Sequence, residues 1–183
     1  MTTRSFPPRV VPALALMAMV GCGGGSSPAT PEPAPSTPGV AVPNEGWTHV
    51  AEGSAITYQN NPPASGPHYP VWLRYAEYTQ AIPRGYWVHN LEHGAIVFLY
   101  QPDAPADMIA KITEAYRALP NDPLCGHKRA VLAPDPLLPW PIAAVAADFV
   151  LRADNASATT IQEFATARRG HGPEQVCDQG SRP

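Results

Sequence analysis

The residues with the most distinctive chemistry stand in the segment WVHNLEHGAIVFLY, which begins at Trp87. Two of the six histidines, His89 and His93, lie four residues apart in it, with Glu92 between them. Side chains four residues apart share one face of a helix and also one face of a strand, so either backbone can direct both imidazoles toward one ion. Imidazole nitrogens and carboxylate oxygens are ligands of zinc and copper(II). The spacing therefore predicts a transition-metal site.

Two further histidines extend this set. His68 lies in SGPHYP, where flanking prolines restrict the backbone and lower the entropy cost of presenting a ligand. His49 precedes the first expected strand. We predict that His68, His89 and His93 bind copper or zinc, and that His49 or Glu92 completes the shell. The alternative from the residues alone is a hydrogen-bonded histidine–carboxylate cluster without metal, in which Glu92 orients an imidazole.

The pattern His-x-x-Glu-His is also that of the inverzincin peptidases, which carry it on a long helix with a further acidic ligand downstream. Here Gly94 and an apolar run follow at once, so a long helix cannot continue. Pro83, Gly85 and Gly94 bracket the motif, and we expect a single tight turn that enters a strand at Ala95. The sequence has no Gly-x-Ser-x-Gly elbow, no P-loop and no dinucleotide fingerprint. The site thus favours metal binding over catalysis.

The N-terminus is typical of a bacterial lipoprotein. Arg4 and Arg9 precede the apolar run VVPALALMAMV, which is too short to span a bilayer comfortably and ends in small residues before Cys22. We predict that residues 1–21 are a signal peptide and that Cys22 is lipidated; a signal cleaved elsewhere without lipid is the alternative. The protein would then be anchored in the bacterial cell envelope, facing the periplasm or the exterior.

Residues 22–43 are rich in glycine, serine and proline, and such a composition predicts a flexible tether. A single globular domain would follow over residues 44–183. Without the first 21 residues, which carry two arginines, the formal charge falls from −3 to −5. No basic cluster occurs, so we expect no nucleic-acid partner, and the membrane is reached through the N-terminal lipid. The sequence does not indicate a protein partner.

Two cysteines remain in the domain, Cys125 and Cys177. An even pair in an exported chain favours a disulfide. The competing interpretation makes Cys125 a metal thiolate beside His127, in the segment CGHKR.

Hydrophobic periodicity and turn residues give the expected elements. Strands are expected at residues 53–60, 94–102, 128–134 and 142–153, helices at 103–120 and 155–170, and a rigid proline-rich loop at 61–72. This order predicts an α+β domain: a small, mostly antiparallel sheet with two helices packed on one face and a long ordered loop. Seven aromatic residues crowd the histidine-bearing segments and are expected to form a minor core or a dry wall around the site.

Three segments, YQNNPPASGPHYPVW, VHNLEHGAIVFLY and IQEFATARRGHGPE, resemble the bacterial domain-of-unknown-function 3105 family. The resemblance covers most of the chain after about Trp47. It implies an exported or membrane-tethered domain without a settled activity, whose two signature motifs contain His68, His89, Glu92 and His93. We therefore expect a tethered extracytoplasmic metal-binding module. A metal-dependent enzyme that uses the same site, or a structural or partner-binding lipoprotein without metal, are the alternatives.

Overall fold

The computed structural model of the chain describes residues 1–2 and 37–182. The predicted signal peptide from residue 3 onward, the predicted lipidation site Cys22 and the predicted tether up to residue 36 lie outside the described residues. Among the residues that are described, no helix is both long enough and apolar enough to cross a bilayer.

Five strands form one sheet in the order β1-β5-β4-β2-β3. They are β1 (Val40–Ala41), β2 (Ile96–Tyr100), β3 (Ala130–Pro134), β4 (Ile142–Ala146) and β5 (Phe149–Arg152). Within this sheet β2 and β3 run parallel, joined through helix α2 (Ala106–Ala118), and the other neighbours are antiparallel. The predicted α+β class and mostly antiparallel sheet are confirmed. The sheet also includes Val40 and Ala41, which the sequence analysis assigned to the tether.

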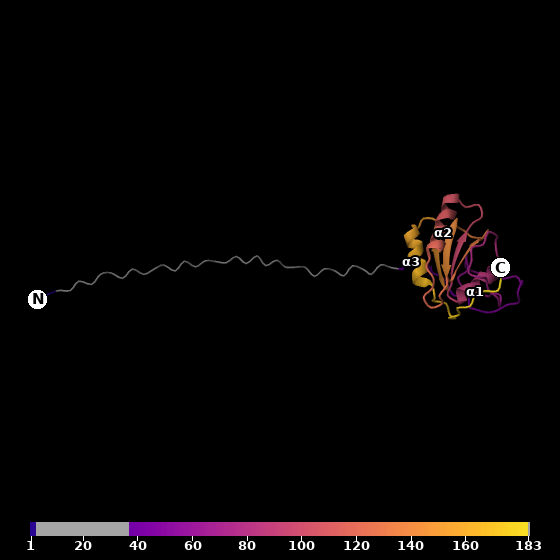
Figure 1. Ribbon diagram of the computed structural model, residues 1–183, viewed down its shortest axis with the longest axis horizontal. Coiled ribbons are helices and arrows are strands. Elements are labelled where there is room, and N and C mark those ends of the chain that lie inside the picture. The colour runs from indigo at the N-terminus through magenta and orange to yellow at the C-terminus, as the bar shows by residue number, and fades with distance from the viewer. Residues whose placement is uncertain (3–36, 183) are drawn as a thin grey trace. The chain divides into compact units, whose positions relative to one another are not determined.

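The two faces of the sheet are covered differently (Figure 1). Ile96 and Phe98 point to the face on which α2 and α3 (Ala158–Arg168) pack. Val97 and Leu99 point to the other face, which is covered by α1 (Arg84–Glu92) and by the long loops. Both faces are therefore buried, which is why β2 reads as an unbroken apolar run rather than an alternating one. The two predicted helices lie on one face, as expected, and α1 is a third helix on the opposite face.

The segment HNLEH lies at the end of α1, so the predicted tight turn is wrong. Pro83 stands at the N-cap with its φ already near the helical value, and Gly94 has a φ of +76° just past the other end. The N–H of Gly94 donates to Leu91 O at 2.8 Å and that of Ala95 to Asn90 O at 2.9 Å, which together make a Schellman motif. Seven of the nine helical residues are buried, so no amphipathic pattern marked the helix in the sequence.

The strand expected at residues 53–60 is also absent from the described chain. The sheet edges are occupied by β1 and β3 instead. The backbone N–H groups of Gln59 and Asn60 donate to the Glu45 carboxylate, each at 2.8 Å, so this extended segment needs no neighbouring strand. Residues 42–83 contain isolated bridges and turns but no named helix or strand.

The single strand expected over residues 142–153 is a hairpin of β4 and β5. Asp148 turns the chain with a φ of +62°, a conformation that Asp tolerates better than most residues. Its carboxylate accepts a 2.7 Å hydrogen bond from the Asn44 amide. Because the turn at Ala147 and Asp148 contains neither glycine nor proline, no helix- or strand-breaking residue marked it in the sequence.

The C-terminal segment wraps around the end of α1, where Figure 1 places the C-terminus beside this helix. The N–H of Gly170 donates to Gly94 O at 2.8 Å, and that of Glu174 donates to Glu92 O at 3.0 Å. A Cβ on Gly172 would lie 2.2 Å from Glu92 O, so only glycine allows this approach.

The predicted disulfide is present between Cys125 and Cys177, 52 residues apart. It fixes the C-terminal segment that wraps around α1. The bond also excludes the alternative in which Cys125 is a metal thiolate.

Candidate metal centre

An isolated β-bridge and helix α1 bring four candidate ligand side chains together. His49 and His68 face each other across an isolated parallel bridge, in which Val50 N donates to His68 O at 2.8 Å and His68 N donates to Thr48 O at 3.0 Å. His89 and Glu92 are three residues apart on α1 and share its face. The bridge and the helix thus present two ligands each to one centre.

Glu92 lies at the middle of this group. Its Oε2 atom is 3.0 Å from the Nε2 atom of His68, 3.6 Å from that of His49 and 3.7 Å from that of His89. One ligand atom from each of the four residues falls within 4.8 Å of all the others. The rings converge nitrogen inward, as the metal prediction requires.

The protonated nitrogens of two of these rings are fixed by backbone carbonyls. Nδ1 of His68 is 2.9 Å from Gly66 O, and Nδ1 of His89 is 2.6 Å from Tyr69 O. A carbonyl oxygen only accepts, so each Nδ1 carries the hydrogen and donates it. In the neutral ring the lone pair is then on Nε2, which faces Glu92. This is the outer hydrogen bond that metal-binding histidines commonly make.

The contact between His68 and Glu92 therefore joins two groups that both offer lone pairs. At 3.0 Å, Nε2 of a neutral His68 and Oε2 of an ionised Glu92 have no hydrogen between them. Both atoms are buried, so water cannot screen the pair. The arrangement requires a cation between them, either a proton or a metal ion.

Three of the four candidate ligand residues are buried, and the fourth is exposed to solvent. His68, His89 and Glu92 are 0%, 3% and 4% exposed, whereas the His49 side chain is 51% exposed and forms the solvent side. The pKa of His89 is lowered to about 4, mainly by burial and in part by the neighbouring histidines, against the Tyr69 carbonyl, which raises it. His89 is thus neutral at pH 7 with its lone pair available.

His93 occupies a neighbouring position and is not among the four. Its Nε2 atom is 3.4 Å from Oε2 of Glu174, and Glu92, His93 and Glu174 form a second group whose ligand atoms lie within 4.8 Å. The sequence analysis grouped His93 with the first ligands and missed Glu174 as a site residue. Glu174 lies in the closing segment HGPE, and only its place in the family resemblance marked it.

Trp72 forms a wall shared by both groups. Its ring centroid is 4.9 Å from that of His89 and 4.5 Å from that of His93, the latter edge to face. Its indole N–H donates to Asp178 O at 3.3 Å, which ties it to the C-terminal segment. Other aromatic residues, Trp87 among them, pack in the core on this face. The expected minor core is therefore present, and Trp72 lies against both histidine groups.

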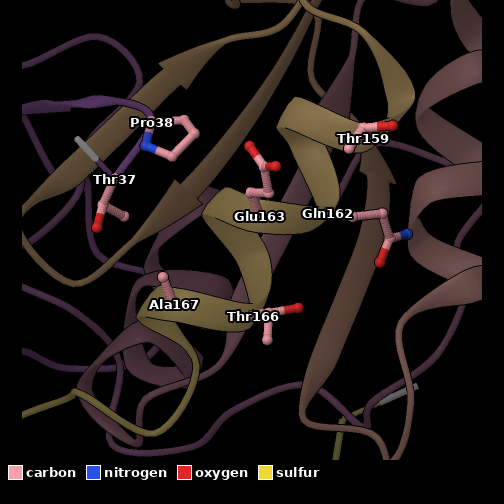
Figure 2. A pocket seen from close by; sticks show the side chains of 7 residues that line it. All are labelled: Thr37, Pro38, Thr159, Gln162, Glu163, Thr166 and Ala167. Atoms are coloured by element: carbon pink, nitrogen blue, oxygen red, sulfur yellow. The ribbon is translucent and has the colours of Figure 1, made fainter. Parts of the chain in front are cut away.

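The remaining histidines lie elsewhere. His127 stacks on Tyr75 with ring centroids 5.6 Å apart, and His171 is exposed; among the described residues neither joins a ligand group. A hollow of about 510 Å³ lies on α3, whose position on the opposite face of the sheet separates it from the histidines. Figure 2 shows that its lining consists of small and amide side chains with a single carboxylate, Glu163. The histidine–glutamate group and this hollow therefore lie on opposite faces of the sheet.

The separations are those of ligand atoms around one ion. Bonds of about 2.1 Å place ligand atoms about 3.0 to 3.4 Å apart, for square-planar neighbours and tetrahedral pairs respectively. The three separations from Glu92 Oε2 are 3.0, 3.6 and 3.7 Å. Three imidazoles and one carboxylate at these distances form a donor set that could hold a transition-metal ion.

The fold and the site define an α+β domain with a buried histidine–glutamate centre. The family model described as "Protein of unknown function (DUF3105)" matches residues 49–180, and the chain belongs to this family. The match begins at His49 and includes all the residues of both ligand groups. No curated protein and no solved structure matched the chain.

Proposed function

We propose that this protein is a membrane-tethered extracytoplasmic module that binds one divalent transition metal ion through His49, His68, His89 and Glu92. The observation that carries the proposal is that one ligand atom from each of these four residues lies within 4.8 Å of all the others. Because His68 donates its Nδ1–H to Gly66, its Nε2 is the ring nitrogen that can bind an ion beside Glu92.

Zinc is the ion that the geometry favours, with copper(II) second. The separations from Glu92 scatter around the value for tetrahedral ligand atoms, about 3.4 Å, and zinc adopts that geometry in closed sites, whereas copper(II) prefers a tetragonal one. The buried, neutral imidazole of His89 can bind an ion without first losing a proton near pH 7.

Four protein ligands support a binding module over an enzyme, because catalytic zinc sites keep a position open for water or substrate. One observation supports the enzyme as a second candidate. The His49 side chain is half exposed, and without it His68, His89 and Glu92 would form a three-ligand site with an open position.

The cellular location rests on the N-terminal sequence. The basic start, the short apolar run and Cys22 support export and lipid anchoring in the bacterial envelope. The disulfide between Cys125 and Cys177 supports an oxidising compartment, because disulfides persist mainly outside the cytosol.

Metal titration of the chelator-stripped protein tests the proposal. Zinc and copper(II) are titrated separately by calorimetry, and bound metal is counted by elemental analysis after gel filtration. We expect tight binding in the wild type and its loss in His68→Ala and His89→Ala. His171→Ala removes an exposed histidine outside the site and is the matched control. Unchanged tight binding in both site variants would refute the ligand assignment.

The variant His49→Ala separates the two candidate functions. A module with four protein ligands should lose at least tenfold in affinity, because one ligand is gone. If affinity is unchanged, His49 is not a ligand and the ion has an open position, which favours the enzyme.

A further inference from the structure

A second set of ligands adjoins the proposed centre. We infer that a second divalent cation binds to Glu92, His93 and Glu174, so that the Glu92 carboxylate bridges two metal ions. This inference rests on the proposed metal site and adds a second ion to it. The juxtaposition that carries it is that both ligand groups contain Glu92.

The geometry of the second group comes from α1 and the C-terminal segment. His93 is the C-cap residue of α1 and only 2% exposed, and its Nε2 atom points to Oε2 of Glu174 at 3.4 Å. Glu174 is held in place because its backbone N–H donates to Glu92 O at 3.0 Å. A separation of 3.4 Å is that of two ligand atoms on one zinc ion with bonds of about 2.1 Å.

The charges at this position favour a cation. Glu92 and Glu174 supply two carboxylates for one neutral imidazole, and His93 lies at the C-terminal end of a nine-residue helix, where partial negative charge gathers. The Glu174 side chain is 54% exposed, which gives an ion a path from solvent.

The spacing suits a pair of ions. The rings of His89 and His93, one from each group, have centroids 4.6 Å apart and lie on consecutive turns of one helix. Carboxylate-bridged pairs in two-metal proteins hold their ions about 3.5–4 Å apart. One carboxylate with two oxygens can serve both ions at this distance.

The second ion should bind more weakly than the first. Nδ1 of His93 is buried and has no hydrogen-bond partner among residues 37–182, whereas Nδ1 of both His68 and His89 donates to a carbonyl. Loss of such an outer hydrogen bond typically lowers metal affinity 10–100-fold. We therefore expect two affinities that differ by about this factor.

The test is zinc stoichiometry in the purified protein, with Glu174→Gln and His93→Ala as site variants. Glu163→Gln makes the same charge change at an exposed position on α3 and is the control. The expected result is two equivalents in the wild type and the control, and one in each site variant, with the tight site intact. X-ray absorption at two equivalents should show a zinc–zinc distance of about 3.5–4 Å.

The outcomes separate this inference from the proposed function. One equivalent in the wild type, lost in His68→Ala, would overturn the second ion and leave the first. Two equivalents that persist in both Glu174→Gln and His93→Ala would also overturn it. No zinc binding at all would overturn the proposed function itself.

Discussion

Replacing Glu92 with glutamine should change the stability of the metal-free and metal-bound protein in opposite directions. Glutamine keeps the shape of the side chain and removes its charge. Without metal, its amide N–H can donate to Nε2 of His68, a hydrogen bond that Glu92 can make at this 3.0 Å contact only if a proton is taken up. One such hydrogen bond contributes about 1 kcal/mol, so the metal-free variant should melt about 3 °C higher than the wild type.

With zinc bound, Glu92→Gln should instead be less stable than the wild type. At a zinc concentration of about 100 times Kd, binding stabilises the wild type by about 2.7 kcal/mol, or about 8 °C. Glu92 Oε2 lies within 3.7 Å of all three imidazole nitrogens, so its loss removes the ligand nearest the centre. Loss of a side chain that only hydrogen-bonds to a metal ligand already lowers metal affinity by up to about 100-fold. If Glu92→Gln weakens zinc binding by that factor, the same zinc concentration stabilises the variant by only about 0.4 kcal/mol, or about 1 °C.

Thermal denaturation with and without zinc measures both effects, with urea titration for the free energies. Glu92→Asp is the companion variant, because it keeps the negative charge but its side chain is shorter by one C–C bond, about 1.5 Å. It should also lose most of the zinc shift. A metal-free Glu92→Gln protein that loses more than about 2 kcal/mol, with the zinc shift intact, would show that Glu92 is an ion-pair partner of protonated histidines instead.

Three further predictions concern the fold that holds the site. Folding lowers the pKa of His89 and His93 from 6.5 to about 4, so the unfolded chain binds more protons than the folded protein between these two pH values. The free energy of unfolding of the metal-free protein should therefore fall between pH 6.5 and pH 4, by up to about 3 kcal/mol per histidine. Urea titrations at a series of pH values measure this fall, and a profile that is flat with pH would contradict the prediction. Replacing both Cys125 and Cys177 with serine should lower the free energy of unfolding by about 4 kcal/mol, because the disulfide that joins residues 52 positions apart is lost. An unchanged free energy of unfolding in urea titration would contradict this prediction. Gly172→Ala places a Cβ 2.2 Å from a carbonyl of α1 and should lower Tm by several degrees, and because Gly172 does not have a positive φ the loss reports this close contact; an unchanged Tm would contradict it.

The ligand types could be predicted from the sequence, and so could the elements with strong local signals. The apolar run of β2 and the periodic helices α2 and α3 carry their own patterns, and Ser157 caps α3 by accepting from Thr160 N, as its residue type suggests. The two-cysteine count in an exported chain likewise predicted the disulfide.

The remaining features depend on tertiary contacts that leave no local pattern. Helix α1 is buried on most sides, so its composition shows no polar face, and its end is set by Gly94 and the packing of Gly172. Which histidines come together in space was equally impossible to predict from the sequence. His49 and His68 meet through a two-hydrogen-bond bridge, and Glu174 reaches His93 only because the C-terminal segment folds back over α1.

The most direct measurement is a crystal structure of the zinc-loaded protein with anomalous data collected at the zinc edge. The account predicts a strong anomalous peak about 2.0–2.2 Å from one atom each of His49, His68, His89 and Glu92, with both fixed Nδ1–H groups still bonded to their carbonyls. An empty centre at full zinc occupancy, or a peak at surface histidines alone, would contradict it.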